Sequence, residues 1–158
     1  MTTEATGEKL TVKFSDLPSV VGREIGPSSW RVVTQEEVNK FADLSGDHNP
    51  IHLDQDFASK TPFKGTIVHG YFTLSLIVPL MAEIFEVTEF GTGINYGLDK
   101  LRFPAPVPVG SRIRVRGKIA DVVEVAGNGY QIHADMTFEV EGSEKPAAAL
   151  AMLVRYYK

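Results

Sequence analysis

The stretch YFTLSLIVPLMAEIF, Tyr71 to Phe85, decides the fold class. Wound as a helix, it is apolar on nearly every side, and such a helix is stable only when other elements bury it. Pro79 lies inside the stretch, so we expect a kink or an altered turn there, because proline lacks the N–H that a helical hydrogen bond needs. The sequence therefore predicts a buried central helix that other elements enclose.

Four later segments can supply the enclosing surface. Their pattern is typical of strands, and in the second and third of them apolar residues recur at every second position. The segments are GINYGLDKLRF (93–103), SRIRVRGKIADVV (111–123), YQIHADMTFEVE (130–141) and AAALAMLVRYY (147–157). Gly127-Asn128-Gly129 predicts a tight turn between the second and third strands, which sets a row of Arg and Lys opposite an acidic row.

Two helices are expected before the central one. In TQEEVNKFADLSG, Thr34 is a good N-cap and Glu37 completes a capping box. LDQDFASKTPF predicts a short helix capped by Asp54. Helices followed by long antiparallel strands indicate an α+β fold, in which a curved antiparallel sheet wraps around a long central helix. The edge strands of such a sheet need protection, so we expect a homodimer, with higher assembly left open.

The bulk composition narrows the classes of function. Of the 158 residues, 43% are hydrophobic and 23% are charged, as in an ordinary globular domain. The net charge of −4 gives no general attraction to nucleic acid or acidic membranes, and we expect neither as a partner. The chain lacks cysteine, which excludes disulfides and thiol nucleophiles. We expect a flexible tail over residues 1–10, one domain over 11–158 and a cytoplasmic location, since the N-terminus has no signal-peptide pattern.

The segment GDHNPIH, residues 46–52, begins where the first helix is expected to end, and it carries candidate chemistry. Pro50 keeps Asn49 out of the helical region, so we expect a non-helical turn that returns His52 towards Asp47. A carboxylate and an imidazole that face one pocket can hold a water molecule and move its proton. Asn49 is expected to brace the turn through its side-chain amide.

Two other interpretations of this segment stay open on local grounds. An Asp-x-Asn-Pro run is also a common surface turn, whose side chains bond to their own backbone, and local chemistry alone favours it. His48 and His52, with Asp47 and Asp54, could ligate a metal ion. Their spacing matches no established ligand pattern, so we expect no metal site.

A second candidate lies at the start of the central helix, in KGTIVHGY. The first N–H groups of a helix have no internal partner and carry the positive end of its dipole. Gly70 lets a ligand approach the backbone, and its N–H could hold the oxygen of a thioester as it becomes an enolate. Close packing of the helix would also explain Gly70. For His69 we favour a buried, hydrogen-bonded histidine without a functional role.

The segments FADLSGDHNPIHLDQDFA and GTIVHGYFTLSL together resemble the hydratase 2 motif of the MaoC-like, (R)-specific enoyl-CoA hydratase family. The similarity covers about residues 28–158, and INYGLDKLRFPAPVPVGSRI is similar to the single-domain bacterial subgroup. Residues that fall at the family's spacing are Gly46, Asp47, Asn49, Pro50, Ile51, His52, Ala58, Ile67, Val68, His69 and Gly70.

The resemblance implies a hotdog fold with dimers formed by edge pairing. It implies reversible addition of water to trans-2-enoyl-CoA, which gives the (R)-3-hydroxyacyl-CoA, with acyl-CoA as substrate and no metal or redox cofactor. Asp47 and His52 match the family's catalytic pair, and Asn49 matches its supporting asparagine. Gly70 matches the position whose amide contributes to the oxyanion hole.

Other features of this chain bear on substrate contacts. The candidates for lining an acyl pocket are Phe63, Tyr71, Phe72, Phe85 and Tyr96, although buried aromatic residues usually belong to the core. The basic row of the second strand is expected to be balanced by the facing acidic row rather than to bind CoA phosphates.

Some relatives carry a serine further along the central helix, where this chain has Ile77 and Val78. Ser75 lies nearby and is expected to bond back to its own helix. Two other functions remain in view. A hotdog acyl-CoA thioesterase would direct water at the carbonyl carbon, and the Asp-x-Asn-Pro-x-His spacing disfavours it. A non-catalytic acyl-binding or heteromeric subunit is disfavoured because both members of the pair are intact.

Overall fold

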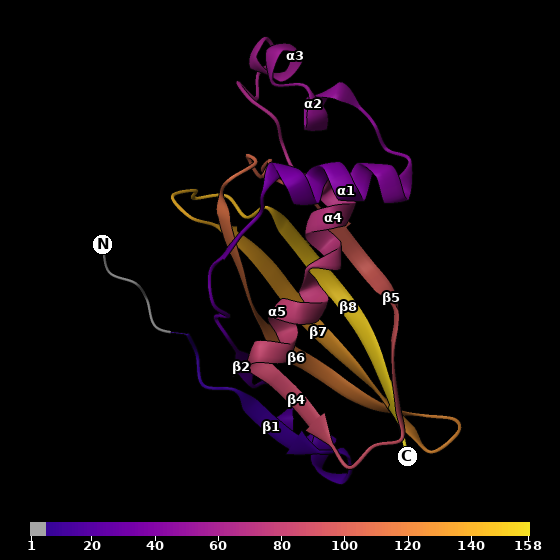
Figure 1. Cartoon of the computed structure of the whole chain (residues 1–158). Coiled ribbons are helices and arrows are strands. Elements are labelled where there is room, and N and C mark those ends of the chain that lie inside the picture. The colour runs from indigo at the N-terminus through magenta and orange to yellow at the C-terminus, as the bar shows by residue number, and fades with distance from the viewer. Residues whose placement is uncertain (1–5) are drawn as a thin grey trace.

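The computed structural model describes residues 6–158, and its main element is an antiparallel sheet (Figure 1). Five strands follow one another across this sheet in the order β2, β6, β7, β8, β5, and β3 pairs with β6 as well. The strands are β2 (Glu24–Ile25), β3 (Arg31–Val32), β5 (Thr92–Arg102), β6 (Arg112–Val125), β7 (Gly129–Val140) and β8 (Ala148–Tyr157). The four predicted long strands are thereby confirmed.

The central helix lies across this sheet in two parts, α4 (Gly70–Ser75) and α5 (Ile77–Ile84) (Figure 1). The helix breaks at Leu76, one turn before Pro79. The reason is that proline has no N–H to donate to the carbonyl four residues earlier, which belongs to Ser75. The expected kink is therefore confirmed, and the α+β arrangement of sheet and central helix is the expected hotdog fold.

The central helix is buried on only one side within a single chain. Phe72, Leu80 and Ile84 are in the core, but Tyr71 and Val78 are 71% and 56% exposed. The expectation of burial on every side is therefore wrong for one chain. The exposed side of the helix is also apolar, and no other described residues cover it.

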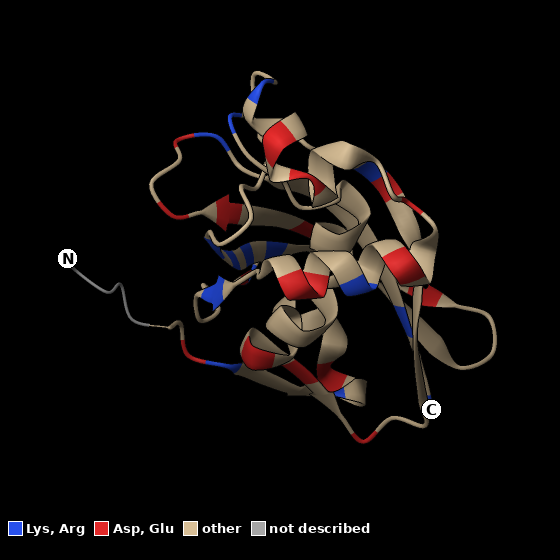
Figure 2. Ribbon diagram, turned by 45° about the horizontal axis from the view of Figure 1, so that its top comes forward, with Lys and Arg blue, Asp and Glu red and all other residues tan. Residues whose placement is uncertain are grey.

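The hairpin of β6 and β7 places the basic row opposite the acidic row, as its sequence predicts. Arg112 faces Glu141 and Arg114 faces Glu139, and both pairs form ion pairs. The Arg114 Nε lies 2.6 Å from the Glu139 carboxylate, which also accepts from Arg116. The basic row is thus balanced by acids, as expected. Over the whole molecule, segments of both charge signs are interspersed (Figure 2).

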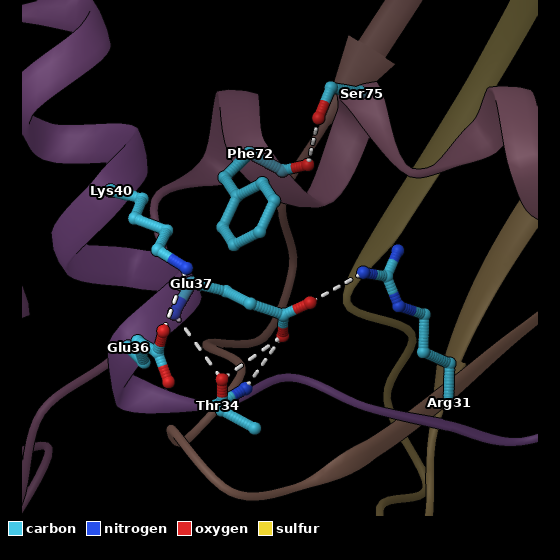
Figure 3. A network of polar contacts seen from close by, with 7 residues as sticks. All are labelled: Arg31, Thr34, Glu36, Glu37, Lys40, Phe72 and Ser75. Atoms are coloured by element: carbon cyan, nitrogen blue, oxygen red, sulfur yellow. Dashed lines mark hydrogen bonds and ion pairs between the residues drawn. The ribbon is translucent and has the colours of Figure 1, made fainter.

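Helix α1 (Gln35–Ser45) begins with the predicted capping box (Figure 3). The Thr34 hydroxyl accepts from the Glu37 N–H, and the Glu37 carboxylate accepts from the Thr34 N–H at 3.0 Å. Arg31 donates to the same carboxylate at 2.6 Å, which ties the start of the helix to β3. Together these bonds fix the helix that leads into GDHNPIH.

The N-terminal part forms a small second sheet that the sequence did not predict. Strand β1 (Leu10–Lys13) pairs in parallel with β4 (Phe85–Thr88), and a 3-10 helix, η1 (Phe14–Val20), follows β1. The expected tail over residues 1–10 is too long, because Leu10 lies in β1 and the Gly7 N–H donates to a backbone carbonyl. Residues 1–5 of that tail lie outside the described residues. Over the described part of the chain, no helix has the length and apolar character needed to span a bilayer.

Candidate active site

GDHNPIH forms a turn followed by a single helical turn. Gly46 ends α1 in the left-handed conformation, with φ of 81°. Asn49 then caps α2 (Pro50–Leu53), and its Oδ1 accepts from the Ile51 N–H at 3.2 Å. The expectation of a wholly non-helical segment is wrong, because Pro50 occupies the first position of a helix, where its missing N–H costs nothing. The helical turn brings His52 back towards Asp47.

Asp47 and His52 face each other across a gap of 3.9 Å between Asp47 Oδ2 and His52 Nε2. This separation is too long for a direct hydrogen bond, but one water oxygen can lie at about 2.8 Å from both atoms. The His52 side chain is 9% exposed, whereas that of Asp47 is 52% exposed. The pair therefore lies at a boundary between the interior and solvent.

Hydrogen bonds fix the orientation of both groups. His52 Nδ1 lies 2.7 Å from the Ile67 carbonyl oxygen. Because a carbonyl only accepts, Nδ1 carries the proton, and in the neutral ring Nε2 presents its lone pair towards Asp47. The Asn49 N–H donates to Asp47 Oδ1 at 3.3 Å. Asn49 therefore braces the turn through its backbone N–H as well as through its side chain.

His69 joins this pair, which the sequence did not predict. Its ring stacks on that of His52, with centroids 3.9 Å apart and an interplanar angle of 29°. Its Nε2 lies 3.0 Å from the main-chain oxygen of Asp47. Burial is the main cause that lowers the pKa of His69 below its ordinary value. It is a buried, hydrogen-bonded histidine, as expected, and it also touches both candidate catalytic residues.

Asp47, His52 and His69 are also the described residues best placed to ligate a metal ion. One potential ligand atom from each lies within 4.8 Å of the others. However, His69 Nε2 is already bonded to a main-chain carbonyl, and a carboxylate–imidazole pair can also serve as an acid–base site. The other candidate ligands point elsewhere: His48 bonds to the Asp43 carboxylate at 2.9 Å, which raises the pKa of His48.

An apolar pocket of about 360 Å³ opens beside His52. Its wall combines the start of the central helix with the connection between β5 and β6. The lining residues are His52, Phe63, Ile67, Val68, Gly70, Thr73, Phe103, Pro104, Ala105, Pro106, Val107 and Ala147. A backbone bond of 2.8 Å from the Val68 N–H to the Val107 carbonyl joins the two sides. Pro104, Pro106 and Phe103 were not predicted to form a wall of the site.

Gly70 lies where both sequence interpretations place it. It is the first residue of α4 and lines the pocket, and its N–H has no acceptor within the helix. It also packs tightly, since a Cβ added there would lie 2.9 Å from the Phe103 ring. The glycine therefore leaves room for Phe103 as well as for a ligand.

The expected acyl-pocket residues divide between three places. Phe63 lines the pocket. Phe72 is in the core and stacks on Phe41, with centroids 5.0 Å apart. Tyr71 and Tyr96 lie on the exposed surface, at 71% and 53% exposure. Phe72 and Phe85 are core residues, as buried aromatic residues were expected to be, and neither lines this pocket. Tyr71 and Tyr96 neither line it nor belong to the core, which corrects the expectation for those two.

The hydroxyl of Ser75 is occupied locally. It donates to the Phe72 main-chain oxygen at 2.7 Å, as expected for a serine inside a helix (Figure 3). Ser75 is not among the residues that line the pocket. The hydroxyl-bearing residue of the central helix that does line it is Thr73, which is 1% exposed.

Comparisons with known proteins place the chain in one family. Residues 16–140 match the family model described as MaoC like domain. The chain is 46% identical over 142 residues to 3-hydroxyacyl-thioester dehydratase Z of Mycobacterium tuberculosis, covering 90% of this chain and 94% of that protein. It is 38% identical over 138 residues to nodulation protein N of Rhizobium meliloti, covering 86% of each.

Among solved structures, an (R)-hydratase from A. caviae involved in PHA biosynthesis superposes with a TM-score of 0.65 at 27% identity. The superposition covers 85% of this chain and 94% of the other. The family model spans most of the chain, and the Mycobacterium relative matches nearly end to end. The chain therefore belongs to the MaoC-like domain family, and it is a hydro-lyase of the dehydratase type.

Proposed function

We propose that the protein catalyses the reversible hydration of trans-2-enoyl-CoA to (R)-3-hydroxyacyl-CoA. The observation that carries this proposal is the 3.9 Å gap between Asp47 Oδ2 and His52 Nε2, beside an apolar pocket that His52 lines. As a carboxylate and as a neutral ring protonated on Nδ1, Asp47 and His52 would both present hydrogen-bond acceptors to this gap. One water molecule can donate a hydrogen to each and keep a lone pair free for carbon.

In the hydration direction, this water attacks C3 of the enoyl thioester. Asp47 is the main base that takes the proton, and His52 positions and polarises the water. Asp47 then returns a proton to C2 as the acid. Because both the hydroxyl and the proton come from the side of the substrate that faces the pair, they add to the same face of the double bond. The pair shares its protons as a coupled unit, so the pKa values of the reaction belong to the pair.

The thioester oxygen gains negative charge as water adds, and Gly70 is the group proposed to bind it. Its N–H has no acceptor inside α4, and Gly70 lines the same pocket as His52. A donor already aimed at the developing charge lowers the barrier without reorganisation during the reaction. Water is the second substrate, and the base and the oxyanion donor are both groups of the protein chain, so the proposed mechanism requires no metal or redox cofactor.

The acyl chain is proposed to occupy the apolar pocket. Its volume of about 360 Å³ is near the lower end of the range of roughly 300–1,000 Å³ for small-molecule sites, which favours a short chain. Phe63 and Phe103 both line the pocket and limit its size. We therefore expect crotonyl-CoA to be hydrated with a higher kcat/KM than an eight-carbon enoyl-CoA.

A second copy of the chain is proposed to cover the exposed apolar side of the central helix. Among the described strands, β5 pairs only with β8, so its other edge has backbone groups without a partner in the described part of the chain. The strand also carries exposed apolar side chains, at Ile94, Tyr96 and Leu98. Edge pairing of two β5 strands would satisfy the backbone and bury these residues together with Tyr71 and Val78.

The dimer can be tested by measuring the molar mass in solution with light scattering during gel filtration. The wild type is expected at twice the chain mass, and Val78→Asp is expected to weaken the association. Leu44→Asp is the matched control, because Leu44 is 87% exposed on α1, away from the proposed interface. A monomeric wild type would contradict this part of the proposal.

The hydration itself is tested with purified wild-type protein and crotonyl-CoA. Loss of the conjugated enoyl absorbance without release of free thiol is the expected result. Release of free CoA would support the thioesterase instead. No change in either signal would refute the proposed activity and favour a binding subunit.

A further inference from the structure

His69 is fixed in the site by contacts on its edge and on its face. Its side chain is buried, and the residue is 2% exposed. Nε2 lies 3.0 Å from the Asp47 main-chain oxygen, so Nε2 must carry the proton of that bond. In the neutral ring, Nδ1 is then a lone pair, and it is buried without a hydrogen-bond partner among the described residues. A second proton on the ring would therefore be buried without an acceptor.

The ring contacts hold His69 against the candidate catalytic imidazole. Its centroid lies 3.9 Å from that of His52, and the 29° angle makes this a stacked pair. Phe41 packs on His69 at 5.0 Å and an angle of 53°. His52 makes one hydrogen bond on its edge, to the Ile67 carbonyl. This bond alone would still let the imidazole ring rotate, and the stacked His69 ring restrains that rotation.

These contacts connect His69 to both groups that would hold the water. Its N–H restrains the main chain of Asp47, whose side chain is half exposed and is oriented by one 3.3 Å bond from Asn49. Its ring face restrains the imidazole of His52. A misplacement of about 1 Å in a reacting group can cost about a hundredfold in rate, so this restraint bears directly on turnover.

We propose that His69 is a positioning residue of the hydration reaction, which holds the Asp47 main chain through Nε2–H and the His52 ring by stacking. This inference rests on the proposed function. It assigns His69 no proton transfer and no contact with substrate. Its role is to keep the 3.9 Å spacing of the pair, as an uncharged ring that does not compete with the pair for protons.

Two substitutions separate the two contacts. His69→Gln can place an amide N–H near the position of Nε2 and keep the bond to the Asp47 carbonyl, but it removes the stacked ring. His69→Phe keeps a ring against His52 and removes the donor. Each is expected to lower kcat for crotonyl-CoA at least about tenfold, with KM within about twofold of wild type, because substrate contacts are unchanged.

Ile119→Ala is the control for a merely destabilised core, since Ile119 is fully buried in β6 and lies outside the pocket lining. It is expected to lower Tm and leave kcat unchanged. The inference is overturned when both His69 variants keep kcat within about twofold of wild type while Tm falls, as it does for Ile119→Ala. A kcat loss of at least about tenfold in each His69 variant, with KM near that of wild type, supports it.

Nitrogen NMR of the imidazole rings tests the same point without turnover. In wild type at neutral pH, His69 is expected as the neutral ring protonated on Nε2, and the His52 ring is expected to carry a proton on Nδ1. In His69→Phe and His69→Gln, the His52 resonances should shift or broaden as that ring becomes mobile. Unchanged His52 signals in both variants would overturn the inference. An inactive wild type would instead refute the proposed function.

Discussion

Replacing Asp47 by Asn tests the proposed base with a minimal change in shape. The amide keeps the size of the carboxylate and leaves the main-chain bond from His69 to Asp47 in place. It removes the negative charge and the proton acceptor that lies 3.9 Å from His52 Nε2. General acid–base groups contribute about 10²- to 10⁴-fold to rate, which corresponds to about 2.7–5.4 kcal/mol of barrier at 1.36 kcal/mol per factor of ten.

The expected result is a fall in kcat for crotonyl-CoA of at least about a hundredfold. Little change in Tm is expected, because the Asp47 side chain is 52% exposed and does not fill the core. The assay follows the loss of enoyl absorbance, and thermal unfolding is measured on the same preparations. Asp43→Asn is the matched control, since Asp43 pairs with the exposed His48 instead of the site. A folded Asp47→Asn protein with near-normal turnover would show that the base is misassigned.

Three further predictions follow from the same site. His52→Ala should lower kcat at least about a hundredfold with the fold retained, and a rate near that of wild type would remove His52 from the mechanism. Gly70→Ala should raise KM about tenfold, because the new Cβ would lie 2.9 Å from the Phe103 ring and would displace that ring within the pocket. Unchanged kinetics would contradict this prediction. Dialysis against a chelator should leave kcat unchanged, and a loss restored by a divalent metal would show that the Asp47–His52–His69 cluster holds an ion.

The pH dependence of stability has a defined sign at His69. Burial lowers its pKa in the folded state, so the unfolded chain binds a proton that the folded one resists. Stability should therefore fall as pH drops below about 6.5, the ordinary value for histidine, and should be unaffected by His69 above it. The drop in Tm between pH 7.5 and pH 5.5 should be smaller in His69→Phe than in wild type. An equal drop in both proteins would contradict the assignment.

Local chemistry made much of the fold predictable. The capping box of Thr34 and Glu37 and the turn at Asn128 depend on residues a few positions apart, and both are present. The pairing of Arg112 with Glu141 does not follow from that turn alone: counted without interruption from Asp121 opposite His133, Arg114 would face Val140. The alternation fails at the bulge between Ile119 and Asp121, where one extra residue shifts the register.

Contacts between distant segments were not predictable in the same way. Leu10 pairs with Phe85, and neither local sequence indicates the other strand. The apolar pattern of the central helix indicated burial but not which side stays exposed in one chain, so the exposure of Tyr71 and Val78 was missed. Both cases depend on tertiary or quaternary partners rather than on local propensity.

In the site too, contacts between residues close in the sequence were predictable, and contacts between distant residues were not. Asp47 and His52 lie five residues apart, so the turn between them could be predicted to bring them together. His69 reaches the Asp47 carbonyl from 22 residues away, and Phe103 reaches Gly70 from another connection. His69 is next to Gly70 in the sequence, and this position gave no indication that the His69 ring stacks on His52. The signal that could have pointed to Phe103 is the run FPAPVPVG, whose prolines suit a stiff wall.

Hydration of crotonyl-CoA in D₂O tests the central claim most directly, because one water held by Asp47 and His52 must deliver both groups to one face. The measurement is the configuration of the product at C3 and of the deuterium at C2, by chiral analysis and NMR. The account predicts (R)-3-hydroxybutyryl-CoA with deuterium and hydroxyl added to the same face. An (S) product, or addition to opposite faces, would contradict it.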